Sequence, residues 1–177
     1  MKSLFYYVRS EWKISKNVGK VFEEDFANSV DKTKCWLYRL RDNAASFSGG
    51  NKTRFSSTNI CDYILYHNDT RTLYLCELKS TKSTSIPYTM LKQNQIDGLT
   101  EASNHLIVPC FIFNYREYNN ATYFMIIDDF NDMKISLKKK SFNPTDLEKY
   151  GALKIYSEKK RTRYHYDIEK LIKETHL

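Results

Sequence analysis

Residues 60–79 have the sequence ICDYILYHNDTRTLYLCELK, and this stretch decides the fold. Its two halves, 60–67 and 73–79, are rich in isoleucine, leucine and aromatic residues, as strands are. The polar sequence NDTR between them, residues 68–71, is typical of a turn. The pattern therefore predicts an antiparallel hairpin.

The position of the turn determines which residues of this hairpin face each other, because side chains alternate between the two faces of a strand. A turn centred on residues 69–70 places Asp62 directly opposite Glu77. A turn centred one residue earlier makes them diagonal neighbours on the same face. Lys79 lies two residues beyond Glu77 and shares its face. Two carboxylates and one ammonium group are thus expected together at one end of the hairpin.

Two neighbouring carboxylates repel each other, so a cation is needed to compensate them. Mg²⁺ is suitable because it binds carboxylate oxygens, water and phosphate. We expect Asp62 and Glu77 to bind it, with the backbone carbonyl of Leu78 as a further ligand. Lys79 could then orient or deprotonate a water molecule, or stabilise charge that develops on a phosphate.

The alternative for these three side chains is an ion pair on the surface of the sheet. The neighbouring residues argue against it, because Ile64, Leu73 and Leu75 share the face and make it apolar away from the strand ends. Charges at the edge of an apolar face are costly unless they are paired or used.

A helix is predicted over residues 16–30, where the apolar residues recur at a spacing of four: Val18, Phe22, Phe26 and Val30. Glu23 lies at the margin of this apolar stripe and could reach the metal from the side. Glu24 is its competitor, and a solvent-exposed helix edge is the alternative for both.

A second helix is predicted over residues 88–105, and Gln95 interrupts its apolar face. A buried amide must find hydrogen-bond partners. Gln95 could satisfy a buried backbone group, or it could hold Lys79 or a catalytic water in place.

Further strands are expected at residues 35–40, 106–115 and 122–128, and a loop or projecting arm at 43–59. Residues 131–163 are basic and polar, and the segment 164–174 forms either a short helix or a pairing strand. The alternation of helices and strands predicts an α/β fold with helices on a mixed sheet. A length of 177 residues fits one domain over residues 1–177.

The composition favours a polyanion as partner, since 28 basic and 21 acidic residues give a net charge of +7. No apolar run reaches the roughly 18 residues that a membrane span needs. The four cysteines form no CxxC pair, so we expect buried free thiols and a cytoplasmic protein.

An ordered set of short motifs resembles the PD-(D/E)xK nuclease superfamily, and within it the RecU-type Holliday junction resolvases. The similarity covers roughly residues 16–172. It is carried by Gly19-x-x-x-Glu23, Ser57-Thr58-x-x-x-Asp62-Tyr63, Glu77-x-Lys79-x-Thr81, Gln95-Ile96, Tyr150-Gly151 and the region 164–172.

The resemblance implies a restriction-endonuclease-like fold, a mixed central sheet flanked by helices, in a homodimer that nicks four-way DNA junctions symmetrically with Mg²⁺ or Mn²⁺. It favours Glu23 over Glu24 and includes Gln95 in the active site. It also implies that the loop 43–58 is a stalk that enters the junction, with Phe47 or Phe55 near unstacked bases. The residues expected to contact DNA are Lys52, Arg54, Ser57, Thr58 and Thr81.

Asn94 stands where this family usually has a histidine, and the stalk is short, which affects junction selectivity more than cleavage. Two other functions remain open. One is a nuclease of the same superfamily that acts on other branched or duplex DNA. The other is a nucleic-acid-binding protein without catalysis, but such a protein gains nothing from two acids that face phosphates.

Overall fold

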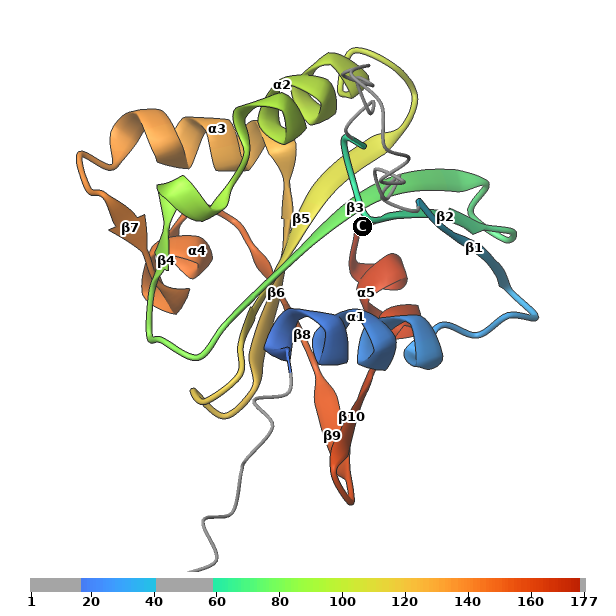
Figure 1. Cartoon of the computed structure of the whole chain (residues 1–177). Coiled ribbons are helices and arrows are strands. Elements are labelled where there is room, and N and C mark those ends of the chain that lie inside the picture. Colours follow the sequence, from blue (N-terminus) through green and yellow to red (C-terminus); the bar gives the residue numbers. More distant parts are fainter. Residues whose placement is uncertain (1–16, 41–58, 176–177) are drawn as a thin grey trace, which may run out of the picture.

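A six-stranded sheet forms the centre of the protein, whose computed structural model describes residues 17–40 and 59–175 (Figure 1). Strands β3 and β5 are parallel, and all other neighbours in the sheet are antiparallel. In spatial order the strands are β1 (Cys35–Arg39), β2 (Tyr63–His67), β3 (Thr72–Thr81), β5 (Val108–Tyr115), β6 (Ala121–Ile126) and β8 (Leu153–Ile155).

Helices cover both faces of this sheet (Figure 1). Helices α2 (Gln93–Ala102) and α3 (Ile127–Ser136) lie on one face, and α1 (Val18–Ser29) and α5 (Ile168–Glu174) lie on the other. The mixed sheet flanked by helices that the sequence predicts is therefore confirmed.

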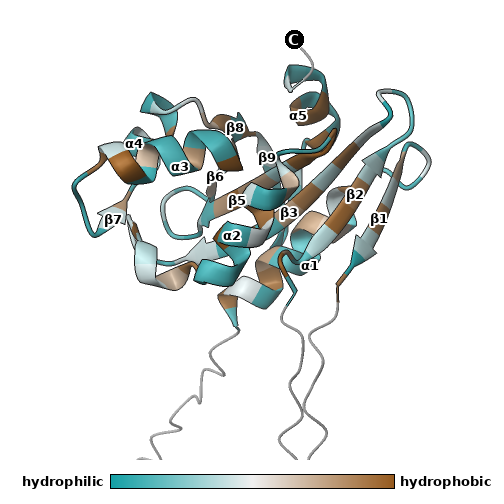
Figure 2. Cartoon of the chain, turned by 90° about the horizontal axis from the view of Figure 1, so that it is seen from above, coloured by the Kyte–Doolittle hydropathy of each residue, from teal (hydrophilic) through white to brown (hydrophobic). Residues whose placement is uncertain are grey.

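Alternation along β3 divides its side chains between two cores. Leu75 packs with Leu99 and Phe130 on the α2–α3 side. Tyr74 and Leu78 pack with the α1–α5 side. Figure 2 shows the apolar residues running along β2, β3 and β5 between these layers. The odd-numbered residues of β3, which include Glu77 and Lys79, thus face α2.

The hairpin of β2 and β3 has the register of a turn centred on residues 69–70, since His67 pairs with Thr72 and Tyr63 with Cys76. Its loop closes with Arg71 at a φ of 54°, in the left-handed region. The first of the two registers predicted from the sequence is confirmed.

The helix predicted over 16–30 is α1, and the side chain of Asn17 caps its N-terminus by accepting a hydrogen bond from Lys20 N. The predicted helix 88–105 is wrong in its first turn. Residues Tyr88–Met90 form a 3₁₀ turn, and Leu91 and Lys92 are extended before α2 begins. Pro87, just before this segment, belongs to β4 (Ile86–Pro87) and pairs with Ser141.

The strand predicted over 122–128 is too long, because the chain enters α3 at Ile127. The polar segment 131–163 is also more ordered than its composition indicates. It contains most of α3, then β7 (Ser141–Phe142), which pairs with β4 (Ile86–Pro87), then α4 (Pro144–Lys149), β8 and β9 (Ser157–Lys160).

The region 164–174 contains both predicted alternatives, a pairing strand and a short helix. Strand β10 (Arg163–Tyr166) pairs with β9 in a hairpin that projects from the sheet (Figure 1), and α5 follows it. All four cysteines are buried free thiols, as expected. None of the helices in the described ranges combines the length and the apolar character needed to cross a membrane.

Candidate active site

Asp62 lies immediately before β2, and backbone and side chain together fix its position. Its N–H donates to the carbonyl of Cys76 at 3.1 Å, and its carbonyl accepts from Leu40 N at 2.9 Å. Its Oδ2 accepts from Leu78 N at 2.8 Å, so the carboxylate binds the backbone of β3 beyond the end of the β2–β3 pairing. The negative charge of Asp62 acts on the carboxyl group of Glu77, so the two acids are neighbours at this end of the hairpin.

Glu77 is fully buried in the middle of β3, where an apolar side chain would be usual. Its Oε1 forms an ion pair with Lys79 Nζ and accepts a hydrogen bond of 2.6 Å from Gln95 Nε2. Its Oε2 is also buried and has no hydrogen-bond partner among the described residues. One oxygen is therefore held by two donors, and the other is unsatisfied.

Burial, followed by the negative charge of Asp62, raises the pKa of Glu77 from 4.5 to about 7. Lys79 and Gln95 act in the opposite direction, because both bind the ionised form. The two donors do not fully offset burial and carboxylate repulsion. A further cation at this position would stabilise the ionised form.

Gln95 extends from α2 toward β3 and is buried with 7% of its surface exposed. Its amide group donates to Glu77, while its own Oε1 lacks a partner within the described parts of the chain. The helix position that interrupts the apolar stripe thus faces the strand that carries the acids. This contact differs from both sequence-based alternatives, because the amide of Gln95 donates to the carboxylate of Glu77 and not to a backbone group or to Lys79.

Glu23 and Glu24 lie on α1, which covers the face of the sheet opposite to Glu77. The carboxylate of Glu24 accepts from Arg163 of β10 at 3.1 Å. The carboxylate of Glu23 pairs with Arg39, and its carbonyl accepts from the hydroxyl of Tyr63. Glu23 is therefore the one beside the strands that lead to Asp62.

The structure does not bring Glu23 together with the other two acids. Within residues 17–40 and 59–175, the carboxylate oxygens of Glu23, Asp62 and Glu77 do not form a cluster within 4.8 Å of one another. Arg39 is a residue that the sequence reasoning missed. Its only signal was a positive charge at the end of a predicted strand.

The remaining predicted site residues are placed as follows. The N–H of Leu78 binds Asp62, and its side chain packs on the α1 side. Thr81 is buried at the end of β3, and its hydroxyl accepts from Ser83 N at 3.0 Å, an arrangement that favours a structural role. Lys52, Arg54, Ser57, Thr58 and the stalk lie outside the described residues.

No family model matches the chain. Among solved structures, the Holliday junction resolvase Hjc of Archaeoglobus fulgidus superimposes with a TM-score of 0.48 and 18% sequence identity. This match covers 77% of the present chain and 95% of the archaeal one.

A sequence relative is much closer. The SPbeta prophage-derived uncharacterized protein YotM of Bacillus subtilis is 33% identical over 172 residues. The match covers 89% of the present chain and 86% of the relative. The chain therefore belongs to the same protein family as YotM.

Proposed function

We propose that this protein is a metal-dependent endodeoxyribonuclease with its catalytic centre at Asp62, Glu77, Lys79 and Gln95. The observation that carries the proposal is the buried carboxylate of Glu77, which Lys79 and Gln95 hold through one oxygen while the other remains unsatisfied. A buried carboxylate in this state is costly, and such costs concentrate at functional sites.

The residues present fit a divalent cation. Glu77 Oε2 and Gln95 Oε1 are buried oxygens without a donor among the described residues, and the charge of Asp62 acts on Glu77. Asp62 and Glu77 would hold Mg²⁺, with the carbonyl of Leu78 as a further oxygen ligand and Mn²⁺ as an alternative ion, whereas the carboxylate of Glu23 is held by Arg39. A bound cation would polarise the phosphate and lower the pKa of water.

The chain's own side chains then have separate roles. Lys79 is only partly buried, with 15% of its side chain exposed, so its ammonium group can reach a phosphate as well as Glu77. It would orient or deprotonate the attacking water and stabilise charge on the phosphate oxygens. Gln95 is a positioning residue, because it holds Glu77 in one orientation through the 2.6 Å hydrogen bond.

Several surface features support DNA as the substrate. The net charge is +7, and the β9–β10 hairpin carries Lys159, Lys160 and Arg161 on exposed positions. On the edge strand β1, the rings of Trp36 and Tyr38 stack with centroids 5.7 Å apart, and both are more than half exposed. Exposed aromatic rings beside basic groups are suited to bind unstacked bases and phosphates.

The four-way junction is proposed as the substrate, cut by a homodimer with the loop 43–58 as its stalk. This finer proposal rests on the resemblance to RecU-type resolvases. Other branched or duplex DNA would use the same catalytic centre. A non-catalytic binding protein is disfavoured by Glu77, because a carboxylate buried beside a phosphate site weakens binding of a polyanion.

The test is a cleavage assay of the full chain on labelled four-way junction, flap and duplex DNA, each with Mg²⁺ and with a chelator. We expect Mg²⁺-dependent, paired nicks in the junction and little cleavage of the duplex. Preferred cleavage of flap or duplex would retain the nuclease and replace the substrate. Binding without cleavage of any substrate, with Mg²⁺ or Mn²⁺ present, would reject the nuclease.

A further inference from the structure

A second cluster of polar side chains lies far from Glu77, at the other end of the β1–β2 pair. Cys35 begins β1, His67 ends β2, and the two are direct partners across the strands. Glu169 joins them from the first turn of α5. The sulfur, one imidazole nitrogen and one carboxylate oxygen all lie within 4.8 Å of one another.

Two of these donor atoms are unsatisfied. His67 Nε2 and Glu169 Oε1 are buried, 3.7 Å apart, and neither has a hydrogen-bond partner among the described residues. His67 itself is buried, with 6% of its side chain exposed. A buried histidine and a carboxylate normally satisfy each other by a direct hydrogen bond, and here the distance is too long for one.

The other polar atoms of both groups are engaged, which orients the free ones toward each other. His67 Nδ1 lies 2.9 Å from the hydroxyl of Thr70. It also accepts a 3.3 Å hydrogen bond from the backbone N–H of Thr70. Glu169 Oε2 accepts from Lys34 Nζ at 2.9 Å. Metal ligands in proteins are commonly oriented by such partners on their remaining atoms.

We propose that Cys35 Sγ, His67 Nε2 and Glu169 Oε1 bind one Zn²⁺ ion. Thiolate, imidazole and carboxylate are the three donor types of protein zinc sites. Tetrahedral bonds of about 2.0 to 2.3 Å require donors about 3.3 to 3.8 Å apart. The 3.7 Å between His67 Nε2 and Glu169 Oε1 already fits, and the sulfur, which lies within 4.8 Å of the other two ligand atoms, would need to approach by at most about an ångström. His67 Nδ1 would then carry the proton and donate to the hydroxyl of Thr70, and the 3.3 Å contact from the backbone N–H of Thr70 would be lost.

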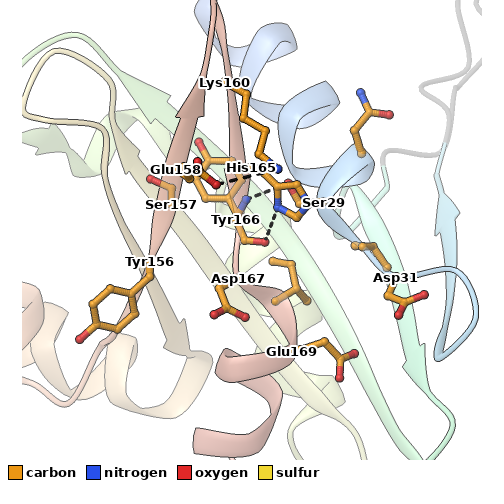
Figure 3. A pocket seen from close by; sticks show the side chains of 13 residues that line it. Ser29, Asp31, Tyr156, Ser157, Glu158, Lys160, His165, Tyr166, Asp167 and Glu169 are labelled. Carbon is orange, nitrogen blue, oxygen red and sulfur yellow. Dashed lines mark hydrogen bonds and ion pairs between the residues drawn. The ribbon is translucent and has the colours of Figure 1, made fainter.

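A cavity of about 680 Å³ lies beside this site, and Glu169 is the one proposed ligand that lines it among the described residues. Figure 3 shows the side chains of Asp31, Asp167 and Glu169 along one part of the cavity wall. These carboxylates favour a cation there, while Lys160 on the cavity wall and Lys34, which pairs with Oε2 of Glu169, act against one. Water from the cavity would complete the fourth position.

The proposed ion would join strands β1 and β2 to helix α5. Its three ligands come from β1, β2 and α5, which are far apart in the sequence. Because the ligand set exists only in the folded chain, bound Zn²⁺ would stabilise the fold. The site is thus structural and independent of the proposed nuclease chemistry.

The experiment is titration of the full chain, after removal of metal with a chelator, with Zn²⁺ in competition with a chromogenic chelator. Co²⁺ replaces Zn²⁺ in a parallel series, because a thiolate ligand gives a charge-transfer band. We expect one equivalent of bound Zn²⁺, the Co²⁺–thiolate band, and a loss of affinity of about tenfold or more in Glu169→Gln and Cys35→Ser. The matched controls Glu174→Gln, on the same helix, and Cys61→Ser, another buried thiol, should bind Zn²⁺ as the wild type does.

Two further measurements keep the result clear. Glu77→Gln should retain Zn²⁺ binding, which separates this site from the nuclease centre. Zn²⁺ should raise the Tm of the wild type and of Cys61→Ser, and leave the Tm of Glu169→Gln unchanged. Absence of bound Zn²⁺ in the wild type, or equal affinity in the wild type and both ligand variants, would overturn the proposal.

Discussion

At position 77 the chain places a carboxylate where a core strand normally carries an apolar side chain. The surroundings of Glu77 hold it through Lys79 and Gln95, yet burial and Asp62 still raise its pKa to about 7. In the absence of metal, the protonated form of Glu77 is therefore favoured by folding. This property can be measured without any DNA substrate.

The first prediction concerns pH and stability in the presence of a chelator. Because the pKa of Glu77 is raised from 4.5 to about 7, the folded state binds more protons than the unfolded state in this range. Its contribution therefore makes the free energy of unfolding fall as pH rises through this range, by at most about 1.4 kcal/mol per pH unit. Glu77→Gln should lack this contribution. Urea denaturation of both proteins across the range measures the difference, and parallel curves would contradict it.

The second prediction concerns Gln95 as the residue that positions Glu77. Gln95→Leu keeps most of the side-chain volume and removes the donor to Glu77 Oε1. Cleavage should fall about 10- to 100-fold, as for other residues that orient metal ligands, with KM nearly unchanged. Gln93→Leu is the control, because Gln93 lies on the same helix, is exposed and contacts Asp97. Equal activities of the two variants would count against the positioning role.

Residues of the candidate site could be predicted where they lie on one hairpin. The alternation of side chains and the turn at 69–70 predict Asp62, Glu77 and Lys79 as neighbours; the structure pairs Glu77 with Lys79, and the charge of Asp62 acts on Glu77. Arg39 could not be foreseen as the partner of Glu23, because their contact depends on how α1 packs against the edge of the sheet.

At the scale of elements, α2 must approach the segment before β2 closely for Gln95 to reach Glu77. Gly98 permits this approach. A Cβ at Gly98 would lie 2.3 Å from Cγ2 and 2.9 Å from Cβ of Ile60, two residues before Asp62. No side chain fits there without movement of the helix or of this segment.

The third prediction follows from this contact. Gly98→Ala should destabilise the protein by about 1 to 3 kcal/mol through overpacking, in spite of the roughly 1 kcal/mol that alanine contributes in a helix. Gly19→Ala in α1 is the matched control, since the nearest atom to its Cβ is 3.5 Å away, and it should be neutral or stabilising. Adding Ile60→Ala should recover part of the loss. A Gly98→Ala variant as stable as Gly19→Ala would contradict the close packing.

Elements with strong periodicity were predictable, and those with short or mixed patterns were not. The strand pattern of 122–128 continued into α3, although Asp128 and Asp129 in its first turn are typical of a helix start. The signal for α4 was also present, as Asn143-Pro144-Thr145-Asp146 forms a capping box. The β9–β10 turn gave none, because Arg161 takes a φ of 57° without glycine.

At the scale of the whole molecule, the net charge of +7 bears on the proposed binding of DNA. The fourth prediction is that log affinity for DNA falls linearly with log salt concentration, because lysine and arginine displace counterions. The double variant Lys159→Gln and Arg161→Gln on the β9–β10 hairpin should reduce this slope by about two. Lys173→Gln on α5 is the control. Fluorescence anisotropy at several salt concentrations measures the slopes, and identical slopes would exclude the hairpin from the DNA surface.

The sequence predicted the α/β class from the order of its elements. It could not predict the parallel pairing of β3 with β5, or the meeting of Cys35, His67 and Glu169. Both depend on contacts between segments distant in the chain, for which local periodicity holds no information. The homodimer, the single domain and the stalk at 43–58 stay predictions.

The central claim is that Asp62 and Lys79 take part in DNA cleavage, and the fifth prediction tests it most directly. Asp62→Asn keeps an oxygen that can accept from Leu78 N, and Lys79→Ala removes the ammonium group, so both should fold. The measurement is cleavage and binding of labelled four-way junction with Mg²⁺, with Asp69→Asn and Lys82→Ala as exposed controls. The account predicts that both site variants bind the junction without cutting it, while the controls cut as the wild type does. Undiminished cleavage by Asp62→Asn or by Lys79→Ala would contradict it.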